Sequence, residues 1–276
     1  MKINIIADSS CDLPKKYLEK INLAPMSLKF KNEVFKDRVN ISPSEFYKKI
    51  KSINYSPGSA APSPGDFLNH LKENQDNFII AISSALSSSY NNATIAKEMF
   101  LEKVNDSFVH VFDTLSASVG EGLVILKLLE LREKSMDNDT LVNELGSYIE
   151  GLNTFFILEH MDNLINSGRM NKIMGKIVSM LNIKLLLGAS NKGEIKVYEK
   201  IRGSQRAFEK LIDYIDDYGS ELENKYLGIA HYDCYEKAKN FKEEVEKRYN
   251  FKEIIITEMG PTIATYADRD AILISF

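Results

Sequence analysis

Short apolar segments alternate with longer amphipathic segments through the first half of this chain, and this alternation restricts the possible folds most. Residues 78–84 precede a predicted helix from about Ser88 to Val104, and residues 108–114 precede another from Ser116 to Lys134. A strand followed by a helix, repeated in this way, is typical of a parallel sheet covered by helices on both faces. The sequence therefore predicts an α/β fold whose N-terminal half is a mainly parallel α/β/α sandwich.

The start of the chain gives further element signals. Residues 3–8 are apolar and predict a strand, after which Asp12-Leu13-Pro14 begins a predicted helix that runs to Ile21. Two later helices are predicted to start at Ser42-Pro43 and at Ser63-Pro64. In each case a serine N-cap precedes a proline at the first helical position, and an acidic residue follows three positions after the cap.

The pattern changes after a predicted helix near residues 139–151. Residues 155–159, 183–189 and 194–201 are strand-like, and the turn residues 191–193 predict a hairpin between the last two. Helices are predicted at 204–218 and 235–248, among strands at 227–230, 253–257 and 271–276. The second half is thus predicted to be α+β with a mixed sheet. We expect two domains, residues 1–153 and 154–276.

Composition narrows the class of protein. The chain has 35 Lys plus Arg against 39 Asp plus Glu among 276 residues, a net charge of −4. Such a balance gives no overall basic field, so we expect no nucleic-acid partner. Uninterrupted apolar runs all fall short of the roughly 20 residues that cross a bilayer. With two distant cysteines, Cys11 and Cys234, we expect a soluble, cytoplasmic protein with reduced thiols and no membrane-spanning segment.

A serine-rich segment follows the apolar residues 79–82, where a helix is predicted to begin. In a doubly wound sheet, ligands bind beyond the carboxyl ends of the strands, and a helix start attracts anions. Five serines between Ser83 and Ser89 therefore suggest a site for a carboxylate or phosphate. The alternative is a structural cap and turn, because serine favours both positions. Taken by itself, the segment favours this structural interpretation.

Several catalytic and cofactor patterns are missing from the sequence. Gly-x-Ser-x-Gly, the phosphate-binding P-loop and His-Glu-x-x-His do not occur, and the four histidines are scattered. We therefore expect no catalytic residue, no metal and no nucleotide cofactor. Asp8 and Asp113 each end an apolar run beside hydroxyl groups, and we expect both to cap the helices that follow.

Several segments, in a fixed order, resemble motifs of the DegV family of bacterial lipid-binding proteins. Residues 8–14, Asp-Ser-Ser-Cys-Asp-Leu-Pro, resemble the family's Asp-Ser-x-x-Asp-Leu-Pro, and residues 83–90 resemble its Ser-Ser-x-Leu-Ser-Gly-Thr-Tyr. Residues 113–118, 164–170 and 260–263 resemble three further family segments. The similarity extends through nearly the whole chain.

The resemblance implies a non-catalytic protein that binds a long-chain fatty acid in a tunnel between its two domains. In some members, a separate ATP-dependent fatty acid kinase phosphorylates the carboxylate of the bound acid. By motif position, Ser87 corresponds to the serine that binds the head group, and Ser59 corresponds to a threonine beside it. Arg169 corresponds to an arginine near the tunnel mouth, where it would contact the head group or a partner.

Two positions depart from the family pattern. Ser88 stands where the family has glycine, and Tyr266 stands where it has the head-group histidine, whereas Ser89 keeps the hydroxyl of the family's threonine. A phenol donates a hydrogen bond but supplies no imidazolium charge. The expected ligand-binding residues are therefore Ser59, Ser87, Ser88, Ser89 and Tyr266.

One enzymatic alternative remains open at this point. Ser87 could act as the nucleophile of a hydrolase or transferase that uses a small acyl or phosphate ester. Such a serine requires an adjacent base, and the sequence identifies none.

Overall fold

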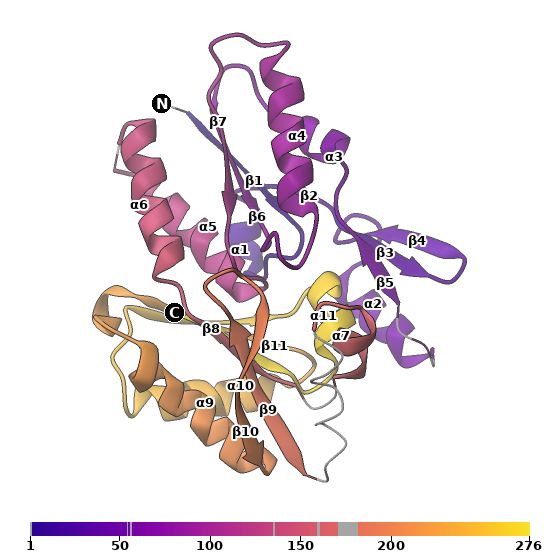
Figure 1. Cartoon of the computed structure of the whole chain (residues 1–276), viewed down its shortest axis with the longest axis vertical. Helices are drawn as coiled ribbons and strands as arrows, with labels where there is room; N and C mark the ends of the chain where they lie inside the picture. Colours follow the sequence, from indigo (N-terminus) through magenta and orange to yellow (C-terminus); the bar gives the residue numbers. More distant parts are fainter. Residues whose placement is uncertain (1, 54, 56, 135, 159–160, 171–181) are drawn as a thin grey trace.

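The N-terminal half is a three-layer α/β/α sandwich (Figure 1). This computed structural model describes residues 2–276 except 54, 56, 135, 159–160 and 171–181. Four parallel strands lie in the order β2-β1-β6-β7. They are β1 (Ile3–Asp8), β2 (Asn22–Ala24), β6 (Asp76–Ala81) and β7 (Val109–Asp113). The predicted parallel sheet is confirmed.

Alternating side chains of these strands form two separate cores. Ile5 and Phe78 face α5 (Val119–Arg132) and α6 (Asn138–Glu150). Ile6 and Ile79, one position further along each strand, face α3 (Pro64–Leu68) and α4 (Ser89–Leu101). Because successive side chains of a strand point to opposite faces, a run of apolar residues buries both faces of the sheet.

The C-terminal half contains a six-stranded mixed sheet, ordered β10-β9-β8-β13-β11-β12. Only the β11–β12 pair is parallel, and the other four pairs are antiparallel. Its strands are β8 (Thr154–Ile157), β9 (Ile183–Ala189), β10 (Ile195–Arg202), β11 (Tyr226–His231), β12 (Glu253–Glu258) and β13 (Ile272–Ser275). The predicted mixed sheet is confirmed, although residue 159 of its predicted first strand lies outside the described residues.

Helices α9 (Ser204–Tyr218) and α10 (Tyr235–Glu246) cover one face of this sheet, and η1 (Leu222–Asn224) follows α9. The opposite face packs against the N-terminal half. Phe156 and Leu273 belong there to the same buried cluster as Val119 of α5 and Leu28. Strands from both halves of the chain therefore share one core, and this core surrounds the site described below.

A smaller sheet, β4-β3-β5, projects beside this shared core (Figure 1). It consists of β3 (Ser27–Phe30), β4 (Glu33–Lys36) and β5 (Gly58–Ala60), with α2 (Pro43–Lys51) beside it. The sequence analysis missed this sheet, and also the short helices α7 (Asp162–Asn166) and α11 (Pro261–Ala267). Strands β3 to β5 are not continuous apolar runs, unlike the equally short β8 and β13, so their sequences did not reveal them.

The predicted helix starts at Ser42 and Ser63 are confirmed. Each serine accepts a hydrogen bond from the backbone N–H three residues later, and the carboxylate of Glu45 or Asp66 accepts one from the backbone N–H of the cap residue. The helix predicted from Asp12 to Ile21 is wrong in extent, because α1 covers only Lys15–Leu18. None of its four residues is buried, so packing does not extend it.

Candidate functional site

A cavity of about 330 Å³ lies between the carboxyl end of the parallel sheet and the inner face of the mixed sheet. This volume is within the range of about 300–1,000 Å³ that is usual for ligand sites. Apolar side chains form most of its wall, among them Leu86, Phe156, Leu158, Leu164, Ile263 and Leu273. They come from loops and strands of both halves of the chain. Such a wall suits an apolar ligand.

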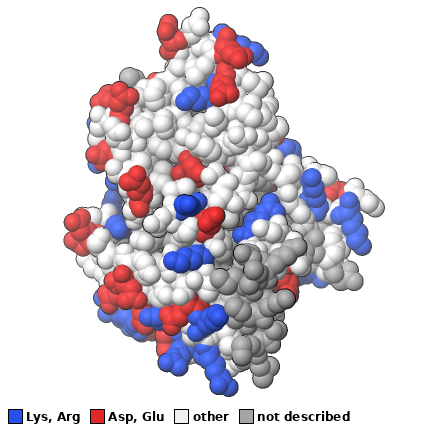
Figure 2. Space-filling model, in the orientation of Figure 1, with Lys and Arg blue, Asp and Glu red and all other residues white. Residues whose placement is uncertain are grey.

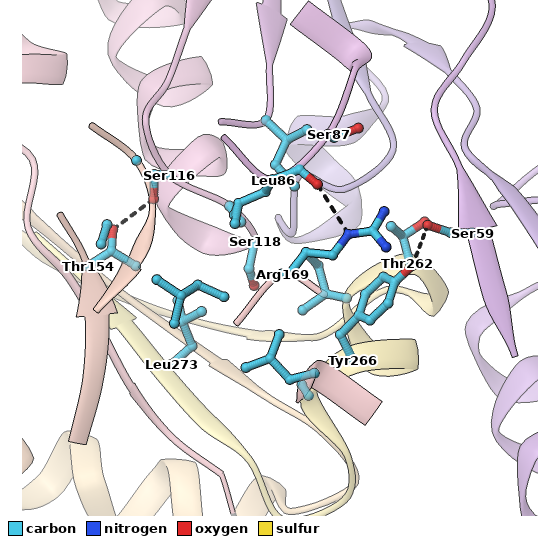
Figure 3. Close-up of a pocket in the computed structure, with 18 of the residues that line it drawn as sticks. Ser59, Leu86, Ser87, Ser116, Ser118, Thr154, Arg169, Thr262, Tyr266 and Leu273 are labelled. Atoms are coloured by element: carbon cyan, nitrogen blue, oxygen red, sulfur yellow. Dashed lines mark hydrogen bonds between the residues drawn. The ribbon is translucent and has the colours of Figure 1, made fainter. Parts of the chain in front are cut away.

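One end of the cavity carries paired hydroxyl groups (Figure 3). Ser59 of β5 and Tyr266 of α11 are hydrogen-bonded through Oγ and the phenol oxygen at 2.8 Å. Two hydroxyls hold two hydrogens, and their mutual bond uses one of them. The other hydrogen can be donated to an anion in the cavity. The structure thus brings together two predicted residues that are 207 positions apart.

Arg169 lies beside this pair and lines the cavity. Its guanidinium carbon lies 5.2 Å from the centre of the Tyr266 ring. Arg169 also donates from Nε to the carbonyl oxygen of Leu86 at 3.3 Å and from Nη1 to that of Ser167 at 3.0 Å. A guanidinium has five N–H groups, so these two bonds leave it with capacity to bind an anion.

The serine-rich loop forms the adjoining wall. Ser87 and Ser88 line the cavity between β6 and α4. Ser88 has φ of −76°, a value that every L-amino acid adopts. The glycine of the family pattern is therefore not required for backbone geometry at this position.

Ser89 occupies a different place from the one we expected. Its side chain is buried and donates a hydrogen bond to Oδ2 of Asp8. Ser89 is also absent from the residues that line the cavity. Its hydroxyl is committed to a buried carboxylate, so we no longer propose it as a ligand contact.

The two aspartates predicted to be helix caps have other roles. Asp8 accepts from the backbone of Ile82 and from both the backbone and the hydroxyl of Ser10, in addition to Ser89. Asp113 accepts from the backbone of Ser84 at 3.1 Å. The capping prediction is therefore wrong for both, because both carboxylates hold loops at the ends of parallel strands.

A second polar group lies at the opposite end of the cavity (Figure 3). Ser116 and Thr154 are hydrogen-bonded at 2.8 Å, and Thr154 is bonded in turn to Ser275 at 2.9 Å. Ser275 donates to the backbone oxygen of Asn153. These hydroxyls join the loop after β7 to strands β8 and β13, and they thereby connect the two sheets.

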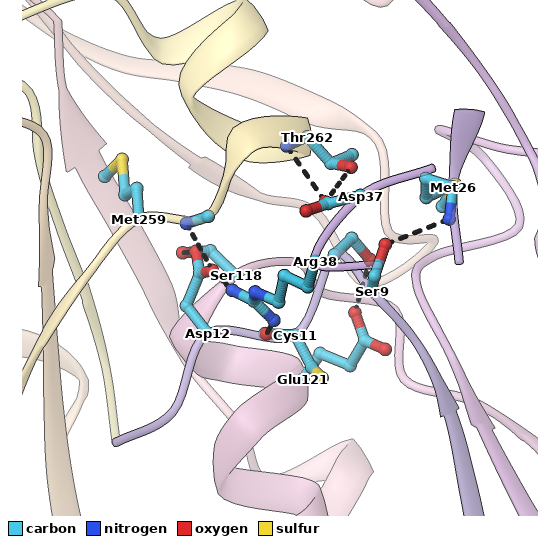
Figure 4. A network of polar contacts seen from close by, with 12 residues as sticks. Ser9, Cys11, Asp12, Met26, Asp37, Arg38, Ser118, Glu121, Met259 and Thr262 are labelled. Atoms are coloured by element: carbon cyan, nitrogen blue, oxygen red, sulfur yellow. Dashed lines mark hydrogen bonds and ion pairs between the residues drawn. The ribbon is translucent and has the colours of Figure 1, made fainter. Parts of the chain in front are cut away.

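Beneath the site lies a buried charged network that the sequence analysis did not identify (Figure 4). Arg38 forms an ion pair with Asp12 at 2.7 Å and donates to the carbonyl oxygen of Cys11. Asp12 also accepts from the backbone of Gly260 and from Ser118, which lines the cavity. Burial raises the pKa of Asp12, against the opposing effects of Arg38 and these donors. The network joins the loop after β1 to the start of α11.

Asp37 extends this network to the cavity wall. Its Oδ2 accepts from both the backbone and the hydroxyl of Thr262, a lining residue. Burial raises the pKa of Asp37. Asp12 entered the sequence analysis only as part of the Asp-Leu-Pro motif and without a role in the site, and no local pattern pointed to Asp37 or Arg38.

Charged groups are few in the cavity and varied on the surface. Among the described lining residues, the charged ones are Arg169 and Glu194. On the face shown in Figure 2, acidic and basic side chains are interspersed over most of the surface.

The described residues contain no group of three or more His, Cys, Asp or Glu side chains that could hold a metal ion. They also contain no helix long and apolar enough to cross a membrane.

Comparison with known proteins gives consistent matches over the whole chain. The sequence model of the DegV family matches residues 2–276. A DegV domain-containing protein of Streptococcus pneumoniae is 31% identical over 217 residues, which cover 77% of each chain.

Two solved structures share this fold. One is a DegV family protein of Ruminococcus gnavus, refined with vaccenic acid, which has a TM-score of 0.93 and 27% identity over 99% of each chain. The other is the fatty acid kinase (Fak) B3 protein of Streptococcus pneumoniae, loaded with linoleic acid. It has a TM-score of 0.90 and 27% identity over 100% of this chain and 99% of that one.

Proposed function

This chain belongs to the DegV family, and from that membership and its cavity we propose that it binds a long-chain fatty acid and is not itself an enzyme. The observation that carries this proposal is the cavity itself, whose wall is mostly apolar between two polar ends, one of which combines hydroxyl groups with a guanidinium. Two proteins of the same fold are described as carrying vaccenic and linoleic acid.

The carboxylate is placed at the Ser59–Tyr266 pair. A buried carboxylate is costly unless hydrogen bonds replace its water shell. Ser59, Tyr266 and Ser87 supply hydroxyl donors, Ser88 lies at the exposed rim beside them, and Arg169 adds a positive charge. Charge-assisted hydrogen bonds of this kind are about twice as strong as neutral ones.

The acyl chain extends from this end along the apolar wall towards Leu273. Each buried methylene contributes about 0.8 kcal/mol, so the chain supplies most of the affinity. Shortening the bound acid by two methylenes should therefore weaken binding roughly 15-fold. The head group mainly fixes the orientation of the ligand.

Mass spectrometry under native conditions tests the assignment. Protein purified without organic solvent should carry a fatty acid, and delipidated protein should rebind oleate. Ser87→Ala and Tyr266→Phe should each raise the Kd for oleate about tenfold or more, because each loses a hydrogen bond to a charged group worth about 1.5–3 kcal/mol. Ser147→Ala, on the exposed side of α6, is the matched control. Failure of the delipidated protein to bind any acyl chain would refute the proposal.

We do not propose the hydrolase alternative. Ser87 requires a base, and the described residues that line the cavity include no histidine and no lysine. The hydroxyl of Ser87 instead accepts from the backbone of Ser89 at 3.2 Å. The Ser87→Ala variant also tests this choice, because loss of ester turnover in that variant would favour an enzyme.

The partner that we propose is a separate ATP-dependent fatty acid kinase. A carboxylate oxygen of the bound acid would attack the terminal phosphorus of ATP and give an acyl phosphate and ADP. The assay follows labelled fatty acid loaded on this protein, with kinase and ATP added. Arg169→Glu should bind oleate more weakly, because the proposed head-group site loses its positive charge, so the assay uses enough oleate to load both proteins equally. At equal loading the variant should give less acyl phosphate, and an unchanged yield would exclude Arg169 from the partner contact.

We also propose a domain boundary and a cellular location for this protein. We place the domain boundary at residues 153 and 154, where α6 has ended and β8 begins the mixed sheet. We place the protein in the cytoplasm, since Cys11 and Cys234 are both unpaired and a reducing compartment keeps thiols free. Limited proteolysis and cell fractionation test these two statements.

A further inference from the structure

Glu121 is a buried acid that the proposed ligand site does not use directly. It lies in the first turn of α5 and is fully shielded from solvent. Its Oε2 lies 2.7 Å from the hydroxyl oxygen of Ser10. Its Oε1 is buried and has no hydrogen-bond partner among the described residues.

The hydroxyl of Ser10 lies between two carboxyl groups. It is in hydrogen-bond contact with Oδ1 of Asp8 and with Oε2 of Glu121. A serine hydroxyl has one hydrogen and can donate to only one of them. Either Glu121 or Asp8 must therefore carry a proton and donate it to Ser10.

The other contacts decide which acid holds that proton. Asp8 accepts two backbone N–H groups, from Ser10 and Ile82, and the hydroxyl of Ser89. These donors suit an ionised carboxylate. Glu121 has the single contact with Ser10, which cannot compensate a buried negative charge.

The groups around Glu121 also favour its protonated form. The charged or titratable groups that face it are Asp8 from β1, Cys11 and Asp12 from the following loop, and Arg38 from the loop after β4. Burial and the charges of Asp8 and Asp12 raise the pKa of Glu121 well above its ordinary value, and Arg38 opposes them only in part.

The resulting hydrogen-bonded chain ends at the ligand site. With the proton on Glu121, Glu121 donates to Ser10 and Ser10 donates to Asp8. One oxygen of Asp8 receives both Ile82 N–H and the hydroxyl of Ser89. Ile82 and Ser89 are the two ends of the loop that contains Ser87 and Ser88. One carboxylate oxygen thus holds both ends of this loop.

We propose that Glu121 is a positioning residue that retains its proton at neutral pH and, through Ser10 and Asp8, holds the Ile82–Ser89 loop in its ligand-binding form. Ionised Glu121 would place two negative carboxylates on either side of one hydroxyl, and Asp8 would lose its donor or gain a repelling neighbour. Ser87 and Ser88 of the loop that Asp8 holds line the cavity, so a carboxylate bound against this loop adds a further negative charge and favours the proton on Glu121 still more. Ligand affinity should fall as pH rises through the pKa of Glu121.

Infrared spectroscopy tests the protonation state without any ligand. Delipidated wild-type protein at pH 7 should show the carbonyl band of a protonated carboxylic acid, and Glu121→Gln should lack it. The matched control Glu133→Gln, on an exposed carboxylate at the end of the same helix, should keep the band. An identical spectrum for the wild type and Glu121→Gln would overturn the proposal.

Oleate binding between pH 6.5 and 9.5 tests the coupling. One linked proton makes the Kd of the wild type rise by up to tenfold per pH unit. Glu121→Gln should bind oleate at pH 7 within about threefold of the wild type and show a flat profile, because its amide donates to Ser10 at every pH. Glu121→Leu should bind weakly throughout. Equal pH profiles for the wild type and Glu121→Gln would overturn the coupling.

The coupling rests on the proposed fatty-acid site, but the two can fail separately. If no variant binds oleate although the infrared band is present, the ligand assignment is wrong and the protonation of Glu121 stands. If oleate binds and the infrared band is missing, the ligand assignment stands and the protonation of Glu121 is wrong.

Discussion

The raised pKa of Glu121 makes a quantitative prediction about folding stability. Glu121 titrates at about 4.5 in the unfolded chain, and burial raises its pKa well above that in the folded protein. Between these two values, the folded state binds one more proton at this site than the unfolded state does. The free energy of unfolding must then fall as pH rises through this window, by about 1.4 kcal/mol for each pH unit.

Replacing Glu121 with glutamine removes this term and preserves the hydrogen bond to Ser10. Glu121→Gln should therefore gain stability relative to the wild type as pH rises. Between the pKa of Glu121 in the unfolded chain and its raised pKa in the folded protein, the difference grows by about 1.4 kcal/mol for each pH unit. More than about one pH unit below the unfolded-state pKa, where Glu121 is protonated in both states, the gap between the two proteins should be constant.

Urea unfolding of delipidated protein at pH 5, 6, 7 and 8 measures the difference. Asp8, Asp12 and Asp37 also have raised pKa values, but they are present in both proteins and largely cancel in the comparison. Glu133→Gln provides the exposed control and should run parallel to the wild type. Parallel curves for Glu121→Gln and the wild type would refute the reasoning.

Three further perturbations test other parts of the structure. Arg38→Met should lower the free energy of unfolding by about 3–5 kcal/mol, as measured by urea unfolding, because it leaves the buried Asp12 carboxylate without its cation. The double variant Arg38→Met with Asp12→Asn should regain part of this loss. Gly193→Ala should cost about 1–2 kcal/mol for its left-handed backbone (φ +72°), and more because its Cβ would lie 2.1 Å from Oγ of Ser83; a calorimetric melting temperature equal to that of the wild type would contradict this. Removing bound fatty acid should lower the melting temperature, and adding it back at 100 times its Kd should restore about 2.7 kcal/mol, with a short-chain acid as the inactive control.

The sequence predicted the regular part of the fold well, and the reason is periodicity. Strands β1, β6 and β7 are continuous apolar segments because helices cover both of their faces, and the boundary residues were within three positions. The helices from Ser42 and Ser63 were recognised because capping boxes are local. Strands β3 to β5 and helix α11 were missed, because they are held by contacts between distant segments and not by a local pattern.

The sequence likewise indicated some residues of the candidate site and not others. The residues alone suggested an anion site near Ser87 but favoured a structural cap and turn, and the family resemblance reversed that order. The role of Ser59 and Tyr266 also came from the resemblance, since no local pattern relates positions 207 apart. The structure then brought these two within hydrogen-bond distance. Asp37 and Thr262, 225 residues apart, form a contact that only the folded chain reveals. The placement of Ser89 could not be predicted, because its partner Asp8 comes from another strand.

Exchange of the family's histidine for Tyr266 changes which group makes the site sensitive to pH. A histidine beside the head group would gain or lose its charge near neutral pH, whereas a phenol and a guanidinium hold their charge states there. Tyr266 bonds to Ser59 and its ring lies beneath the guanidinium of Arg169, so the positive charge in the proposed site comes from the arginine. Dependence of fatty-acid binding on pH above neutrality must then originate elsewhere in the molecule. Glu121 is connected to the head-group loop through Ser10 and Asp8, which makes it the group to which that dependence is assigned.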